Sequence, residues 1–134
     1  MGIQLSACGV ICSQCPAFVA GQSADPAART RVAAAWHEIY GLSFGPEVIT
    51  CGGCLGPDEE VFITSRKCAA RSCCRARGLA NCAACADRPC AKLEQAQTNW
   101  DGLEERAPTL PAPVFRAFVQ PYCHARQRVP PTAG

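Results

Sequence analysis

Cysteine is the residue type in this sequence that is best suited to chemistry. Twelve cysteines occur among 134 residues. Three pairs have the C-x-x-C spacing: Cys12 with Cys15, Cys51 with Cys54, and Cys82 with Cys85. A tight turn with cysteines three residues apart can direct both sulfur atoms to one tetrahedral zinc ion, each at about 2.3 Å from the metal. We therefore expect the thiols to bind metal rather than to serve only as small buried groups.

The predicted metal ligands are the cysteines that fall into close groups along the chain: Cys8, Cys12, Cys15, Cys51, Cys54, Cys68, Cys73, Cys82, Cys85 and Cys90. One zinc site is expected to combine the cysteines of residues 51–54 with those of residues 68–73, because the two groups follow closely. A second site would take four of the six cysteines in residues 8–15 and 82–90, and spacing does not choose among them. The sequence thus predicts two zinc ions, with enough thiols for a third.

The predicted compartment favours metal over disulfides. The first basic residue is Arg29 and polar residues interrupt the early apolar positions, so the charged start and apolar run of a secretory signal are missing. No stretch has the ~18 consecutive apolar residues of a membrane span. We expect a soluble, cytoplasmic protein, whose cysteines stay reduced and available for metal.

The composition also predicts that metal supports the fold. Hydrophobic residues make up 49% of the chain, but many of them are alanine and cysteine. Leu, Ile, Val and Phe together account for only about one fifth, near the level at which chains struggle to bury a core. Bound metal can supply the missing folding free energy.

Four segments show patterns of regular structure. Residues 25–41 predict a helix, with Asp25 as the N-cap, Pro26 at the first helical position and Gly41 as the stop. Residues 47–51 and 60–64 are short β-branched or aromatic runs on either side of a glycine-rich turn, and they predict a β-hairpin that carries a zinc knuckle. Helices are also expected at residues 68–77 and, after Asp87 and Pro89, up to Pro108.

The expected fold class is α+β: a small, irregular, metal-stapled domain of three to four helices plus the short hairpin. We expect residues 1–107 to form the cysteine-rich domain. Residues 108–134 form a proline-rich extension, in which Val114, Phe118 and Tyr122 are among the residues that pack back on the domain. The end of this extension is expected to be frayed.

Several short motifs together resemble a known family. They are C-G-x-x-C-x-x-C-P-A from Cys8, I-x-C-x-G-C at residues 49–54, C-x-x-R-x-C at residues 68–73, and G-x-x-x-C-x-x-C-x-x-x-P-C-x-x-L at residues 78–93. The combination resembles the small cysteine-rich bacterial and archaeal family catalogued as domain of unknown function 3795. The resemblance implies a compact zinc-binding protein without an assigned reaction, and it places all ten predicted ligands on family positions. Cys74 and Cys123 lie outside the pattern.

Other functions remain as alternatives. Four thiolates also suit an iron-sulfur cluster such as [4Fe-4S], which would make the protein an electron-transfer or redox protein. The basic run Arg66, Lys67, Arg71, Arg75 and Arg77 could contact nucleic acid, but we favour its role in compensating nearby thiolates. His124 could join Cys123 as a ligand pair, and Cys74 is a candidate free thiol. The sequence has no H-E-x-x-H motif and no nucleophile elbow, so it indicates an interaction or regulatory module with a protein partner rather than an enzyme.

Overall fold

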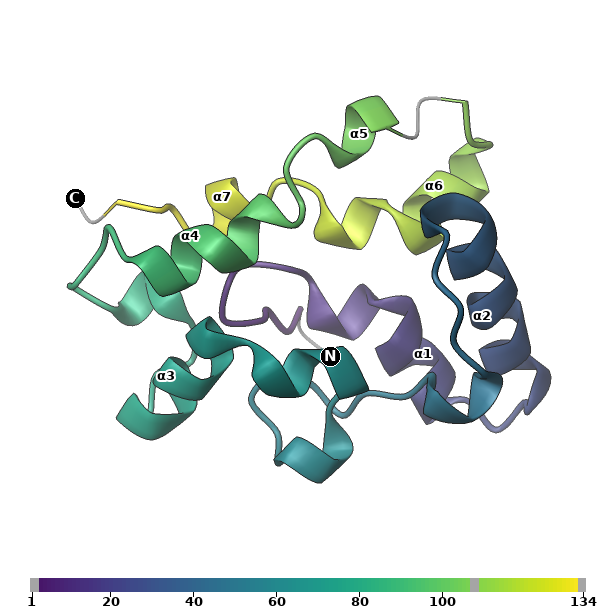
Figure 1. The fold of residues 1–134 in the computed structure, drawn as a ribbon, viewed down its shortest axis with the longest axis horizontal. Coiled ribbons are helices and arrows are strands. Elements are labelled where there is room, and N and C mark those ends of the chain that lie inside the picture. The colour runs from purple at the N-terminus through teal and green to yellow at the C-terminus, as the bar shows by residue number, and fades with distance from the viewer. Residues whose placement is uncertain (1–2, 107–108, 133–134) are drawn as a thin grey trace.

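The computed structural model of the chain describes residues 3–106 and 109–132. Its α-helices are α1 (Pro16–Gln22), α2 (Ala27–Tyr40), α3 (Ala69–Arg77), α4 (Ala91–Thr98), α5 (Leu103–Arg106), α6 (Ala112–Phe118) and α7 (Ala125–Arg128). Short 3-10 turns lie before and between them, at Cys12–Gln14, Pro46–Val48, Asp58–Glu60, Ile63–Lys67, Cys82–Ala84 and Gln120–Tyr122. Figure 1 shows α2 and α3 toward opposite ends of the molecule, with the N-terminal segment and α1 between them.

The predicted α+β class is wrong, because the described residues contain no β-strand and hence no hairpin. The two runs expected to pair form 3-10 turns, at Pro46–Val48 and at Asp58–Glu60 and Ile63–Lys67. Proline begins or precedes the first two of these turns, and its fixed φ favours a turn over a paired strand. One backbone hydrogen bond, from Gly52 N–H to Glu60 O at 2.6 Å, joins the two sides. The segment is therefore a glycine-rich loop closed at its base.

Helix α2 confirms the helix predicted for residues 25–41 and its end at Gly41, but it begins at Ala27, so Pro26 rather than Asp25 is the N-cap residue. The Asp25 carboxylate accepts a hydrogen bond from Ala27 N–H at 2.9 Å, which satisfies one donor of the first turn. Gly41 ends the helix in the left-handed region at φ 71°, as glycine commonly does. Trp36 is buried on this helix and packs edge-on against Phe62, with ring centroids 5.2 Å apart.

Helices α3 and α4 each begin directly after a cysteine. Cys68, just before α3, and Cys90, just before α4, both have an extended backbone conformation. Helix α4 is shorter than predicted, because it ends at Thr98. The chain then passes Gly102, which has a φ of 73°, before α5 begins. The expected end at Pro108 lies outside the described residues.

Buried side chains form two clusters. The smaller one contains Ala17, Ala20, Val32, Trp36 and Ile49. The larger one joins the N-terminal segment, α3, α4 and the C-terminal segment, and it contains four thiols: Cys8, Cys74, Cys82 and Cys123. Sulfur thus takes the place of aliphatic carbon in part of the larger core, in line with the low content of large aliphatic residues.

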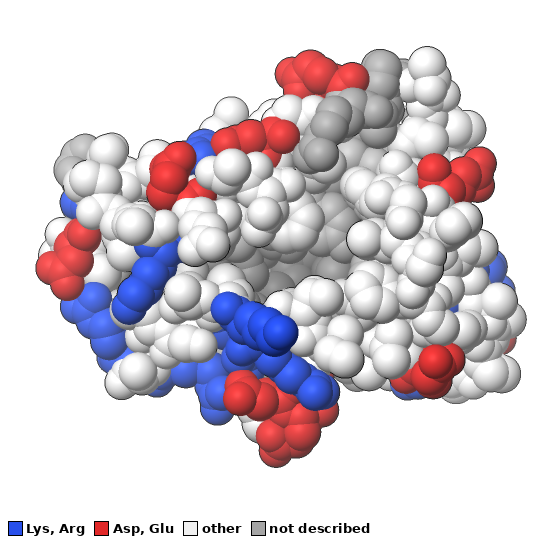
Figure 2. Space-filling view, in the orientation of Figure 1, with Lys and Arg blue, Asp and Glu red and all other residues white. Residues whose placement is uncertain are grey.

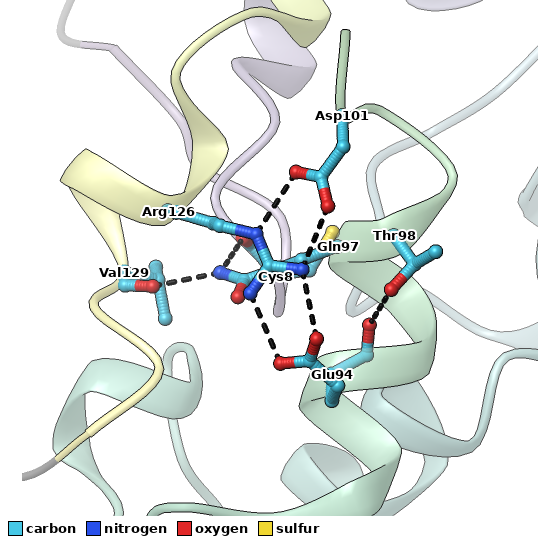
Figure 3. A network of polar contacts seen from close by, with 7 residues as sticks. All are labelled: Cys8, Glu94, Gln97, Thr98, Asp101, Arg126 and Val129. Atoms are coloured by element: carbon cyan, nitrogen blue, oxygen red, sulfur yellow. Dashed lines mark hydrogen bonds and ion pairs between the residues drawn. The ribbon is translucent and has the colours of Figure 1, made fainter.

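The C-terminal segment is tied to this larger core by polar contacts (Figure 3). The fully buried Gln97 of α4 donates through Nε2 to Cys8 O at 3.0 Å and to Val129 O at 2.7 Å. Arg126 lies between the carboxylates of Glu94 and Asp101, with N–O distances of 2.8 to 3.0 Å. Val129, near the end of the chain, is fully buried. The predicted domain boundary at residues 107 and 108 lies outside the described residues.

In the part of the chain that the structure describes, no helix has the length and apolar character needed to cross a lipid bilayer.

Candidate metal centre

Two of the C-x-x-C pairs lie together in the fold. Cys12 begins a 3-10 turn that Cys15 closes, with Cys15 N–H donating to Cys12 O at 3.1 Å. Cys51 and Cys54 flank two glycines, and Gly53 adopts φ 111°, a conformation that residues with a side chain rarely adopt. The Cys12 thiol interacts electrostatically with all three of the other thiols. We call these four cysteines the knuckle cluster.

Burial dominates the chemistry of the knuckle cluster. It raises the pKa of the Cys12 thiol well above its usual value, and the neighbouring thiols of Cys54, Cys15 and Cys51 raise it further. Burial likewise raises the pKa of Cys54 to about 11. Backbone N–H groups act in the opposite direction: Cys54 N–H favours the Cys12 thiolate, and Ala7 N–H lies 3.5 Å from the Cys54 sulfur. Without a cation the thiols of Cys12 and Cys54 stay protonated, and donors already face the two sulfurs that a cation would ionise.

Cys15 is held at a helix start and by a tyrosine. It lies just before Pro16 at the N-terminus of α1. Burial raises its pKa, while the Tyr122 hydroxyl, 3.1 Å from the sulfur, and the N–H groups of Ala17 and Phe18 lower it. The contact with Tyr122 connects the knuckle cluster to the C-terminal segment. Tyr122 is itself buried and stacks on Trp100, with ring centroids 4.8 Å apart.

The knuckle cluster lies where the two cores meet. Cys51 packs against the smaller core and Cys54 against the larger one. Cys15 packs against both. A cation shared by these thiols would therefore link two hydrophobic clusters that are each small.

A second group of thiols surrounds a cavity of about 180 Å³ between α3 and the segment that leads into α4. We call it the α3 cavity. The thiols that line it are Cys73, Cys74, Cys82, Cys85 and Cys90. Three cations, Arg77, Arg88 and Lys92, and the carboxylate of Asp87 also line it. The five thiols are possible metal ligands, and the three cations could compensate the negative charge of the thiolates. This cavity is therefore the second place where the chain could hold a metal.

Contacts within the α3 cavity are specific. The sulfur atoms of Cys74 and Cys82 lie 3.6 Å apart, and burial raises the pKa of Cys82 to about 12. Arg77 donates to the Cys85 sulfur at 3.0 Å and pairs with Asp87 at 3.2 Å. Cys90 differs from the others: the N–H groups of Leu93 and Lys92 at the start of α4 lower its pKa. The Cys90 thiol therefore ionises more readily than an ordinary cysteine.

The two remaining predicted ligands lie between these groups. Cys8 is buried and interacts electrostatically with Cys54 on one side and Cys82 on the other. Cys68 likewise interacts with Cys54 and with Cys74. Among residues 3–106 and 109–132, no three His, Cys, Asp or Glu side chains are arranged to hold a metal ion as they stand. The thiols are neighbours that would have to close around an ion.

Sequence reasoning missed two members of these sites. Cys74 was a candidate free thiol, yet its sulfur faces that of Cys82. Successive residues on a helix point about 100° apart, yet Cys73 and Cys74 both line the α3 cavity. Tyr122 was expected to pack back on the domain, but its contact with Cys15 carried no sequence signal, because the two residues lie 107 positions apart. Cys123 is buried and donates to Val119 O at 3.5 Å, whereas the neighbouring His124 is exposed.

Comparison with known proteins agrees with the cysteine pattern. The family model described as "Protein of unknown function (DUF3795)" matches residues 4–95, which include both the knuckle cluster and the α3 cavity up to α4. No curated protein and no solved structure matches the chain significantly. The match extends over more than half of the chain and confirms the resemblance seen in the motifs, and the chain therefore belongs to the DUF3795 family of proteins of unknown function.

Proposed function

We propose that this chain is a zinc-binding protein and that Cys12, Cys15, Cys51 and Cys54 form a structural zinc centre. One observation supports this most: two C-x-x-C turns far apart in sequence, at residues 12–15 and 51–54, have thiols that lie in one neighbourhood. Two such knuckles supply the four sulfur ligands of a closed tetrahedral site.

The donor set fits zinc. Soft thiolate ligands select zinc, copper(I) or iron-sulfur clusters over hard cations. Raised pKa values of Cys12 and Cys54 leave these thiols protonated in the absence of metal, and a nearby dication would ionise them. Backbone N–H groups of Cys54 and Ala7 then serve as hydrogen-bond donors to the thiolates. Such outer contacts are typical around metal ligands.

The proposed role of the metal is structural. Cys51 and Cys54 contact different cores, so a shared ion would connect them, and its binding free energy would add to the stability of the fold. A site closed by four cysteines leaves no open position for substrate. We propose that the folded domain then acts as an interaction or regulatory module rather than as an enzyme.

We do not propose that the basic run of residues 66–77 binds nucleic acid. Figure 2 shows Lys and Arg side chains gathered on the side of the molecule where α3 lies. Three members are engaged within the chain: Arg71 is 1% exposed and donates to the carbonyls of Cys54 and Gly56, Arg75 pairs with Asp58, and Arg77 contacts the Cys85 sulfur. These contacts support a role for the basic side chains in positioning loops and in compensating the negative charge of nearby thiolates.

The test is the zinc content of the protein after purification without added metal. The variant Cys51→Ser with Cys54→Ser should lose about one zinc ion per chain by elemental analysis, because half of the ligands are gone. Cys123→Ser, which changes a buried thiol outside the cluster, should retain the wild-type content. Equal zinc content in both variants would contradict the proposed centre. A brown protein that contains iron would indicate an iron-sulfur cluster in place of zinc.

A further inference from the structure

We propose that the α3 cavity is a second thiolate centre for zinc and that Cys74, a residue outside the family pattern, is one of its ligands together with Cys82. The proposal rests on the proposed function for the identity of the cation. Its ligands and its position are separate from those of the knuckle cluster.

The distance between the two sulfurs fits a shared ion. Two ligands bound to a tetrahedral zinc ion at about 2.3 Å lie roughly 3.8 Å from each other. The Sγ atoms of Cys74 and Cys82 are 3.6 Å apart. Both side chains are buried, at 1% and 9% exposure, so this pair is fixed by packing while the cavity remains open beside it.

Three further thiols are available to complete the site. Cys85 follows Cys82 in a 3-10 turn, where Cys85 N–H donates to Cys82 O at 3.1 Å. This is the same local turn, with the same hydrogen-bond distance, as that of Cys12 and Cys15. Cys73 and Cys90 also line the cavity. All three are only partly buried, which leaves their side chains room to rotate toward the buried pair.

Positive charge around the cavity matches the charge of such a centre. A zinc ion with four thiolates carries a net charge of −2. Arg77 donates to the Cys85 sulfur, and Arg88 lies nearby with its guanidinium on the carbonyls of Ala83 and Cys85. Lys92 lies in the first turn of α4 and also lines the cavity. The single carboxylate, Asp87, is paired with Arg77, which leaves the surround positive.

A disulfide is the competing use of the same pair. Oxidation of the Cys74 and Cys82 thiols by a peroxide would form one S–S bond of about 2.05 Å, with both protons leaving in the water produced. Freshly purified protein tests this by mass spectrometry under denaturing conditions without reductant. A metal-free chain with Cys74 joined to Cys82 would overturn the zinc proposal.

The deciding experiment counts zinc in the full-length chain and in matched variants. Wild type should carry about two zinc ions, and Cys74→Ser with Cys82→Ser about one. Cys123→Ser is the control and should carry two. A double variant that folds, by circular dichroism, and retains the wild-type zinc content would overturn the proposal.

A milder variant covers the case in which the double variant does not fold. Cys74→Ser alone should weaken one of the two zinc sites by at least about tenfold in competition with a chromophoric chelator. Unchanged affinity at both sites would overturn the role of Cys74. Failure of the knuckle cluster is distinguishable, because it would leave one zinc ion that responds to Cys74→Ser but not to substitution of Cys51 and Cys54.

Discussion

The Cys15 sulfur lies 3.1 Å from the Tyr122 hydroxyl, so a proposed zinc ligand near the N-terminus contacts a residue near the C-terminus. Tyr122 is buried and its ring stacks on Trp100. Burial raises the pKa of Tyr122 well above its ordinary value. Its hydroxyl therefore keeps its proton and can donate a hydrogen bond to a thiolate. This contact joins the proposed zinc site to the packing of the C-terminal segment.

Tyr122→Phe should therefore affect both stability and metal binding. It removes the hydroxyl and keeps the ring stacked on Trp100, so we expect the free energy of unfolding to fall by about 1 kcal/mol. Zinc affinity of the knuckle cluster should fall as well, since the Cys15 thiolate loses a donor. Tyr40→Phe is the control, because its hydroxyl donates to Phe118 O at 2.8 Å instead of to a thiol. Zinc affinity that changes equally in both variants would contradict this account.

Gln97→Met should destabilise the fold without changing its shape. The substitution keeps the side-chain length and removes the donor that serves Cys8 O and Val129 O. Two buried carbonyls would lose a partner, at a cost of about 2 kcal/mol. Urea unfolding measures this cost, and Gln95→Met at an exposed position of the same helix should cause little change. Equal effects of the two substitutions would argue against the buried contact.

Arg71→Lys should disturb the loop that carries Cys54. The guanidinium donates to Cys54 O at 2.5 Å and to Gly56 O at 2.7 Å, and it pairs with Asp58. A single ammonium group cannot reproduce this fork, so we expect a loss of about 2 kcal/mol in the free energy of unfolding. Arg75→Lys is the matched control, because Arg75 pairs with the same carboxylate from a more exposed position. Wild-type stability of Arg71→Lys would contradict the assigned role.

Arg126→Gln should lower stability in a pH-dependent way. Hydrogen bonds from Arg126 hold the pKa values of Glu94 and Asp101 below their ordinary values. A lowered carboxylate pKa stabilises the fold above the unfolded pKa, near 4, and this contribution is lost as pH falls through the lower folded values. The difference between wild type and variant should be largest at neutral pH and should vanish once the pH lies below the lowered folded-state pKa values of both carboxylates. Arg116→Gln on α6 is the control, and a difference that grows toward acid pH would contradict the ion pairs.

The helix boundaries that the sequence predicted well are those with local signals. Gly41 ends α2 as predicted, and the helix predicted at residues 68–77 spans Ala69–Arg77, directly after Cys68. Pro89 and Asp87 marked the start of α4 within a few residues. Each of these features depends on capping or on helix periodicity, which neighbouring residues determine.

The errors arose where tertiary contacts decide. The β-branched runs around residues 47–51 and 60–64 suggested strands, but prolines and a single closing hydrogen bond produce turns. Helix periodicity continued through Trp100 and Leu103, yet Trp100 stacks on Tyr122 in the break between α4 and α5. The sequence prediction joined Cys51 and Cys54 to Cys68 and Cys73, and left open only which cysteines of residues 8–15 and 82–90 share the second site. The electrostatic contact of Cys12 with Cys51 and Cys54 is a long-range contact that spacing does not reveal.

Zinc X-ray absorption of the purified protein tests the central claim most directly, since it reports the atoms bound to the metal. We predict a first shell of sulfur alone, about four atoms at roughly 2.3 Å from zinc. Protein without zinc, or zinc bound mainly by nitrogen or oxygen at about 2.0–2.1 Å, would contradict it.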